Sequence, residues 1–183
     1  MLRKIPDGAG GIIEAPLAMP VWLDPVSDGG TPMVRALQVA TKVVTAWTAR
    51  FRDSFPPIVI NLTDGVSTDG DPRQAAAALR STRTDDGQVL LFNVHLSGGP
   101  VGEVAFPSSA KSLPDAYATM LFEMSSELPA QLAEAAGVAG YRIGPGARGF
   151  LYNAKAVAVT EFLDIGTRAV TPGGLNELTA GTG

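Results

Sequence analysis

Apolar residues recur along this chain with two different spacings, and each spacing predicts a kind of secondary structure. Between residues 33 and 51 they follow at steps of three and four, which places them on one stripe of an α-helix. The stripe consists of Met33, Leu37, Ala40, Val44, Trp47 and Phe51. Two nearly continuous apolar runs, IVINL at 58–62 and QVLLFNVHL at 88–96, instead predict strands of a parallel sheet that are buried on both faces.

Capping residues, prolines and glycines divide the chain into further elements. Thr31 and Pro32 suit the cap and the first position of the long helix, and Asp71-Pro72 is a second start of the same kind. We also predict helices at 114–125, at 129–136 ending at Gly137, and from Asn153 to about Ile165 ending at Gly166. Short strands are expected at 12–15, 19–23, 102–106 and 149–152, with Pro16 and Pro20 favouring an edge position for the first two.

The alternation of buried strands with helices predicts an α/β fold with a mostly parallel sheet flanked by helices. We expect one domain over residues 12–167, preceded by a flexible N-terminus at 1–11 and followed by a flexible tail at 168–183. In open α/β sheets the sites lie at the carboxyl ends of the strands, which directs attention to Thr63, Asp64 and Gly65.

Composition narrows the classes of function. Among 183 residues, 45% are hydrophobic and 17% charged, which indicates a globular chain, and the net charge of −4 without a basic patch argues against nucleic acid and anionic membranes as partners. The absence of cysteine excludes disulfides and thiolate chemistry. No apolar run reaches the roughly 20 residues of a membrane span, and no signal-peptide core follows Met1, so we expect a cytoplasmic protein.

Two motifs in a fixed order resemble the von Willebrand factor A (vWA) family. They are GGTP at 29–32 and IVINLTDG at 58–65, and the run TDGVSTDGDPRQAAAALR continues as such domains do from strand to helix. The resemblance covers roughly residues 19–166. Within the family it is nearest to the bacterial cytoplasmic branch associated with tellurium resistance and stress.

The resemblance implies a Rossmann-like vWA fold and part of a metal-ion-dependent adhesion site, or MIDAS. It assigns Thr31 as the loop ligand and Asp64 as the carboxylate ligand, direct or through water, of a Mg²⁺ ion. Such an ion takes about six oxygen ligands, and one short of protein carboxylates can accept a carboxylate from a partner. The family's D-x-S-x-S motif is absent, however, and Asp24-Pro-Val-Ser27-Asp28 has the wrong spacing. We therefore expect a domain that is incomplete at its N-terminus, with metal binding weak or absent in this chain alone; truncation, a gene remnant and true divergence all remain open.

Plainer interpretations stand beside these assignments. Thr31 is also a helix cap, Asp64 can bond nearby backbone amides, and Asp69 and Asp71 suit turns and caps. His95, the single histidine, has no evident catalytic partner in the sequence, and Trp22 and Trp47 are expected at the core or its rim. The segment GYRIGPGARG, with Arg142 and Arg148, lacks the order of a phosphate-binding loop.

The leading hypothesis is a non-enzymatic protein–protein interaction module of vWA type. The resembled branch is linked with protein-kinase-like and phosphatase-like partners in stress or tellurite-resistance systems, so the resemblance implies a partner of that kind. One alternative is a metal-dependent phosphoester hydrolase that uses the acidic loop residues Asp24, Asp28, Asp64, Asp69 and Asp71. Another is a structural subunit that associates with other chains, or with itself, through an open sheet edge.

Overall fold

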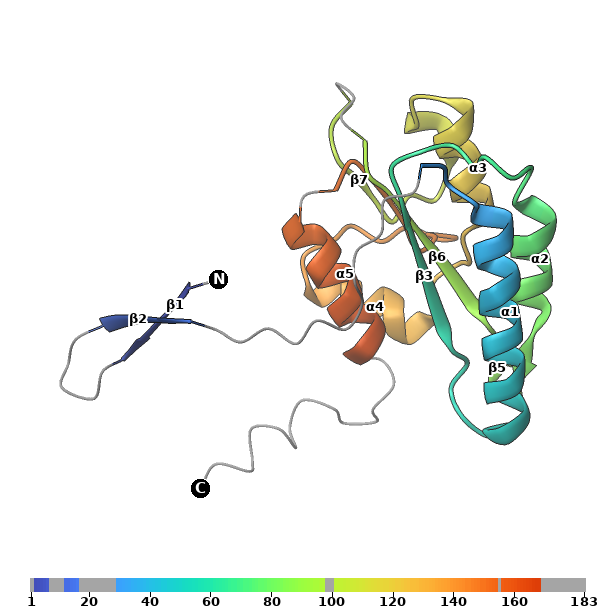
Figure 1. Ribbon diagram of the computed structural model, residues 1–183, viewed down its shortest axis with the longest axis horizontal. Helices are drawn as coiled ribbons and strands as arrows, with labels where there is room; N and C mark the ends of the chain where they lie inside the picture. The colour runs from blue at the N-terminus through green and yellow to red at the C-terminus, as the bar shows by residue number, and fades with distance from the viewer. Residues whose placement is uncertain (1, 7–11, 17–28, 98–100, 155, 169–183) are drawn as a thin grey trace.

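The fold is seen in a computed structural model that describes residues 2–6, 12–16, 29–97, 101–154 and 156–168 (Figure 1). The helices are α1 (Met33–Arg50), α2 (Arg73–Ser81), η1 (Ala110–Ser112, a 3-10 turn), α3 (Ala116–Met124), α4 (Ala130–Val138) and α5 (Ala156–Arg168). The strands are β1 (Leu2–Pro6), β2 (Ile12–Pro16), β3 (Ile58–Thr63), β4 (Arg83–Thr84), β5 (Gly87–Gln88), β6 (Leu90–His95), β7 (Val104–Ala105) and β8 (Phe150–Tyr152).

The predicted α/β architecture is confirmed. In the described part of the chain the main sheet has the order β3-β6-β8-β7, with β3, β6 and β8 parallel and β7 antiparallel. Helices α1, α2 and α3 cover one face and α4 and α5 the other, as Figure 1 shows. The result is three layers, helix on sheet on helix, as expected when a parallel sheet is buried on both sides.

Strand β6 forms the centre of both hydrophobic cores because its side chains alternate between them. Leu91 packs with α1, α2 and α3, while Phe92 and Val94 pack with α4 and α5. Every residue of β6 is buried. The continuous apolar pattern at 88–96 thus predicted the environment of this strand correctly.

A network of polar side chains lies in the core between the sheet and helices α1, α2 and α3. The Asn93 side chain is fully buried, and its Nδ2 donates to the carbonyl of Leu121 at 3.1 Å and to Ser125 Oγ at 3.0 Å. Its Oδ1 accepts a bond of 2.9 Å from Asn61 Nδ2 on β3. A buried polar group left without its partner costs about 1–3 kcal/mol, so these bonds fix β3, β6 and α3 in one arrangement.

Strand β3 differs from its prediction. It pairs with β6 along one edge, and no strand in the described ranges pairs with its other edge. Its residues before Leu62 are only half-buried, and Leu62 is 47% exposed. Burial on both faces was therefore wrong for this strand, because a strand at the end of a sheet lacks the neighbour that would complete its cover.

Helix α1 has the predicted position but a slightly different buried face. Met33, Leu37 and Val44 are buried, whereas Trp47 and Phe51 are 37% and 39% exposed and contact each other, with ring centroids 5.0 Å apart. The fourth buried position of the helix is Thr48. The apolar stripe is buried over the first three turns of the helix and is partly exposed in the last turn.

Several boundaries also differ from the sequence pattern. Leu2–Pro6 pairs as β1 with β2, although the glycine-rich start of the chain gave no strand signal. Helix α4 continues through Gly137, and α5 continues through Gly166 to Arg168. The predicted strand at 19–23 lies outside the described residues. In the described chain no helix is long and apolar enough to cross a membrane.

A glycine decides how closely β8 approaches β6. A Cβ atom on Gly149 would overlap the ring of Phe92, which is buried against Phe162. At the same position, the backbone carbonyl of Gly149 accepts a hydrogen bond of 3.0 Å from the backbone N–H of Asn93. The backbone at position 149 lies so close to the Phe92 ring that only glycine fits there.

Candidate functional site

The loop after β3 is held against the beginning of α1 by a pair of hydrogen bonds between Thr31 and Thr68. The Thr31 amide donates to Thr68 Oγ1 at 2.9 Å, and the Thr68 amide donates to the Thr31 carbonyl at 3.0 Å. These two residues lie 37 positions apart in the sequence. The predicted GGTP and TDG motifs are thereby brought together at the carboxyl edge of the sheet.

Asp69 secures this arrangement because it caps α1 from a distance. Its Oδ1 accepts from the Val34 amide at 3.0 Å, its Oδ2 from the Arg35 amide at 2.9 Å, and Ser67 Oγ adds a further bond of 2.9 Å. The first amides of a helix have no partner within the helix and carry a partial positive charge, which favours a carboxylate. Desolvation acts to raise the pKa of Asp69, but these hydrogen bonds outweigh it and hold the pKa below 3.8.

Thr31 does not cap α1, contrary to the plainer interpretation of the sequence. Pro32 occupies the cap position, and no side chain of the cap residue bonds to the helix. The Thr31 hydroxyl instead lies against Gly65, where an added Cβ would come within 3.3 Å of it. Because Asp69 satisfies the helix amides, the hydroxyl of Thr31 is left to face the TDG loop.

Asp64 lies in the bend that follows β3 and is exposed to solvent. The turn behind it is closed from two sides: Thr63 Oγ1 donates to the Gly65 carbonyl at 2.9 Å, and the Tyr117 hydroxyl donates to the same carbonyl. Thr63 itself is buried. Asp64 is therefore exposed on a braced turn whose next residue, Gly65, lies against the Thr31 hydroxyl.

His95 lies directly behind this turn, at the end of β6. Its ring meets Tyr117 and Tyr152 edge-on, with centroid distances of 5.2 Å to both. The side chain is buried, and Nδ1 has no hydrogen-bond partner. Desolvation lowers the pKa of His95, and the negative charges of Asp115 and Asp64 oppose the shift without cancelling it.

The described residues supply too few ligands for a complete metal site. No group of three or more histidine, aspartate or glutamate side chains converges anywhere in the described ranges. Thr31 and Asp64 offer one hydroxyl and one carboxylate, whereas both oxygens of Asp69 already accept helix amides. A Mg²⁺ ion needs about six oxygens, so these two residues alone could supply only part of such a site.

Asp71, another acidic residue considered for metal-dependent hydrolysis, is engaged with Arg73 at the start of α2. Asp71 pairs with Arg73 at 2.8 Å and accepts the Arg73 amide at the start of α2. Hydrogen bonds from the Arg73 amide and then from its side chain lower the pKa of Asp71. Asp24 and Asp28 lie outside the described residues. Trp22, expected in the core, also lies outside them.

The sequence did not indicate that Asp69 and Tyr117 hold the loop after β3 in place. Both act over long sequence separations, Asp69 on α1 and Tyr117 on the turn after β3. The only local signal for Asp69 was its place in a second T-D-G run, at residues 68–70, which equally fits an ordinary turn. Tyr117 shows the spacing of a helix core residue, and nothing nearby in sequence indicates a polar contact.

Lowering the pH should destabilise the protein because His95 takes up a proton on unfolding. This loss should occur at pH values above those at which carboxylates titrate. With its pKa lowered in the folded state, this histidine takes up a proton more readily when the chain unfolds, so stability falls as the pH drops below about 6.5. Urea unfolding between about pH 7.5 and 5.5 should show this loss. His95→Phe should flatten the dependence in that interval, and since His95 is the single histidine, an unchanged slope would refute the assignment.

Comparison with known families and proteins agrees with the geometry of this edge. Residues 21–99 match the family model described as von Willebrand factor type A domain. That segment contains α1, β3, the loop after β3, α2 and β6, and with them both Thr31 and Asp64. Neither the curated proteins nor the solved structures gave a match. The match and the α/β sheet together support a vWA domain with a vWA-like fold.

Proposed function

We propose that this protein is a protein–protein interaction module of vWA type that binds its partner with the loops at the carboxyl edge of the sheet. The family match supports the general class, a domain used for adhesion and interaction. The observation that carries the proposal is the long-range attachment of the loop to α1 through Asp69 and Thr68. A loop fixed in this way presents its outer residues without an ordering cost on binding.

The outer residues of this edge combine one charge with apolar side chains. Asp64 is exposed, Val66 beside it is 63% exposed, and Leu96, directly after His95, is 38% exposed. Exposed apolar residues next to a fixed polar group are typical of interaction surfaces. These three residues are the contact surface of the proposal.

The proposal also includes a divalent cation bound at this surface. Thr31 and Asp64 would hold it on the protein side, and further oxygens would have to come from water, from other residues or from the partner. The bound ion would supply an electrophilic centre for a partner carboxylate. A kinase- or phosphatase-like partner in a bacterial stress or tellurite-resistance system rests on the sequence resemblance alone. A cytoplasmic location rests on the sequence, in which we found neither a membrane-length apolar run nor a signal-peptide core.

The unpaired edge of β3 favours a second candidate function, association through the sheet. An exposed strand edge presents unpaired backbone groups that another strand can extend. In the described chain β3 has only β6 as a neighbour, and Leu62 is exposed next to the unpaired edge. Under this candidate the protein is a structural subunit that completes its sheet with a second chain or a second copy of itself.

The interaction surface can be tested by placing a photo-crosslinking amino acid at position 66. In cells that express the protein, we expect this position to give a discrete crosslinked partner, which Asp64→Ala diminishes. The matched control is the same amino acid at Val138, which is 81% exposed at the end of α4. Equal crosslinking from both positions, or none from position 66, would contradict the proposed surface.

Calorimetric titration with Mg²⁺ and Mn²⁺ tests the metal separately. We expect weak binding, roughly millimolar, because the described residues supply two ligands. Asp64→Ala should abolish the binding heat, and Thr31→Val should reduce it by removing the hydroxyl alone. Asp71→Ala is the matched control, since it removes a carboxylate that pairs with Arg73. Absence of binding in the unaltered protein, or no loss with Asp64→Ala, would remove the metal from the proposal.

Light scattering over a range of protein concentrations tests the sheet edge. If β3 pairs with a second copy, the mass should double as the concentration rises. A proline replacing Ile60 in β3 should prevent this by removing a backbone donor and disturbing the strand; circular dichroism would show whether the variant still folds. A monomer at every concentration would exclude self-pairing through this edge.

A further inference from the structure

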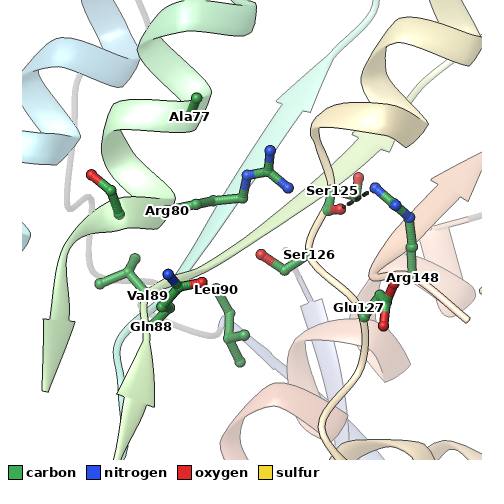
Figure 2. A pocket seen from close by; sticks show the side chains of 10 residues that line it. Ala77, Arg80, Gln88, Val89, Leu90, Ser125, Ser126, Glu127 and Arg148 are labelled. Carbon is green, nitrogen blue, oxygen red and sulfur yellow. Dashed lines mark hydrogen bonds between the residues drawn. The ribbon is translucent and has the colours of Figure 1, made fainter. Parts of the chain in front are cut away.

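A cavity of about 500 Å³ opens at the end of the sheet opposite to the strand-end loops. Its walls come from the end of α2, the residues around the start of β6 and the segment that follows α3. Figure 2 shows the guanidinium group of Arg80 extending into this space and Arg148 on the far side. None of the residues assigned to the interaction surface contributes to the cavity.

Arg80 is a cation for which the described structure provides no counter-charge. Its Nε is buried and has no hydrogen-bond partner. Desolvation lowers the pKa of Arg80, and the positive charge of Arg148 lowers it further. Glu127 lines the rim but is exposed, and it forms no ion pair with either arginine.

Arg148, in contrast, is held firmly in place. One of its terminal nitrogens donates to the carbonyls of Glu123 and Ser125, at 2.9 and 3.0 Å, and its guanidinium carbon lies 5.1 Å from the ring centre of Phe122. A guanidinium has five N–H donors, so these two bonds leave others for a ligand. Arg148 therefore forms one fixed wall of the cavity.

A serine hydroxyl lies between the two cations. Ser126 Oγ accepts the Leu91 amide at 3.0 Å, which fixes the oxygen and leaves the hydroxyl proton to be donated. Ser126 is 9% exposed, and Figure 2 shows it between Arg80 and Arg148. Apolar atoms of Val89 and Leu90 form another part of the wall.

We propose that this cavity binds a small organic phosphate monoester, with its phosphoryl group between Arg80 and Arg148. Two guanidinium groups and a hydroxyl match a doubly charged tetrahedral anion with several acceptor oxygens better than they match a single carboxylate. The anion would supply the partner that Arg80 lacks. A volume of 500 Å³ is in the usual range for small-molecule sites and leaves room for an organic group along Val89 and Leu90.

Phenyl phosphate is a suitable probe, with inorganic phosphate and benzoate for comparison. At constant ionic strength, phenyl phosphate should raise the unfolding temperature of the full chain and bind measurably in calorimetry. Arg80→Gln should weaken this binding about tenfold or more, because a charged hydrogen-bonding partner is lost. Without ligand, Arg80→Gln should be at least as stable as the unaltered protein, since it removes the repulsion from Arg148 and a buried Nε that lacks a hydrogen-bond partner.

Controls separate this site from general charge effects and from the interaction surface. Arg35→Gln removes the same charge from an exposed position on α1 and should leave the binding of phenyl phosphate unchanged. Asp64→Ala should leave it unchanged as well.

Three results would overturn the proposal. The first is no stabilisation of the unaltered protein by phenyl phosphate, and the second is equal affinity for Arg80→Gln. The third is equal binding of benzoate, which would exclude the phosphoryl preference. Inorganic phosphate binding as tightly as phenyl phosphate would overturn the assignment of Val89 and Leu90 to an organic group.

Discussion

The buried amide of Asn93 is the constraint on which the arrangement of this sheet depends. It lies in the middle of the central strand, where water cannot satisfy it, so each of its bonds must be made within the protein. Asn61 on β3 and the end of α3 provide the partners. A shift of β3 by one residue would move Asn61 to the other face and break this network. The same register sets Thr63 opposite His95, and thus fixes the two strand ends that build the candidate site.

The carboxyl edge is organised by an acid that would bind no metal itself. Asp69 joins the loop to α1 through both of its oxygens, which leaves the Thr31 hydroxyl facing the TDG loop and Asp64 exposed. The division of roles has a physical reason, since the amides of a helix N-terminus need an acceptor and the loop needs an anchor. The result is a surface that is rigid before any partner arrives. This rigidity supports a binding role whether or not a cation takes part.

The sequence pattern predicted the features that depend on local periodicity. The helix at α1, the strand ends at Thr63 and His95 and the α/β class all follow from spacing and from a few capping residues. The apolar run IVINL misled in one respect: it indicated a strand buried on both faces, because hydrophobicity alone does not show whether a neighbouring strand is present. Trp47 was placed at the core or its rim, and at 37% exposed it lies at the rim.

What the sequence could not show is how distant polar groups meet. Arg80 ends an ordinary amphipathic helix, and Arg148 belongs to a glycine-rich segment that lacks the order of a phosphate-binding loop. Neither position is notable until the fold places them across one cavity with Ser126 between them. Gly149 takes part in this placement, because its lack of a side chain lets the chain after Arg148 approach Phe92 and so sets the position of the arginine. Burying the Nε of Arg80 without a hydrogen-bond partner costs free energy, and a bound anion would offset that cost. The two ends of the sheet therefore differ in kind: one presents a carboxylate outward on a braced loop, and the other gathers positive charge inside a cavity.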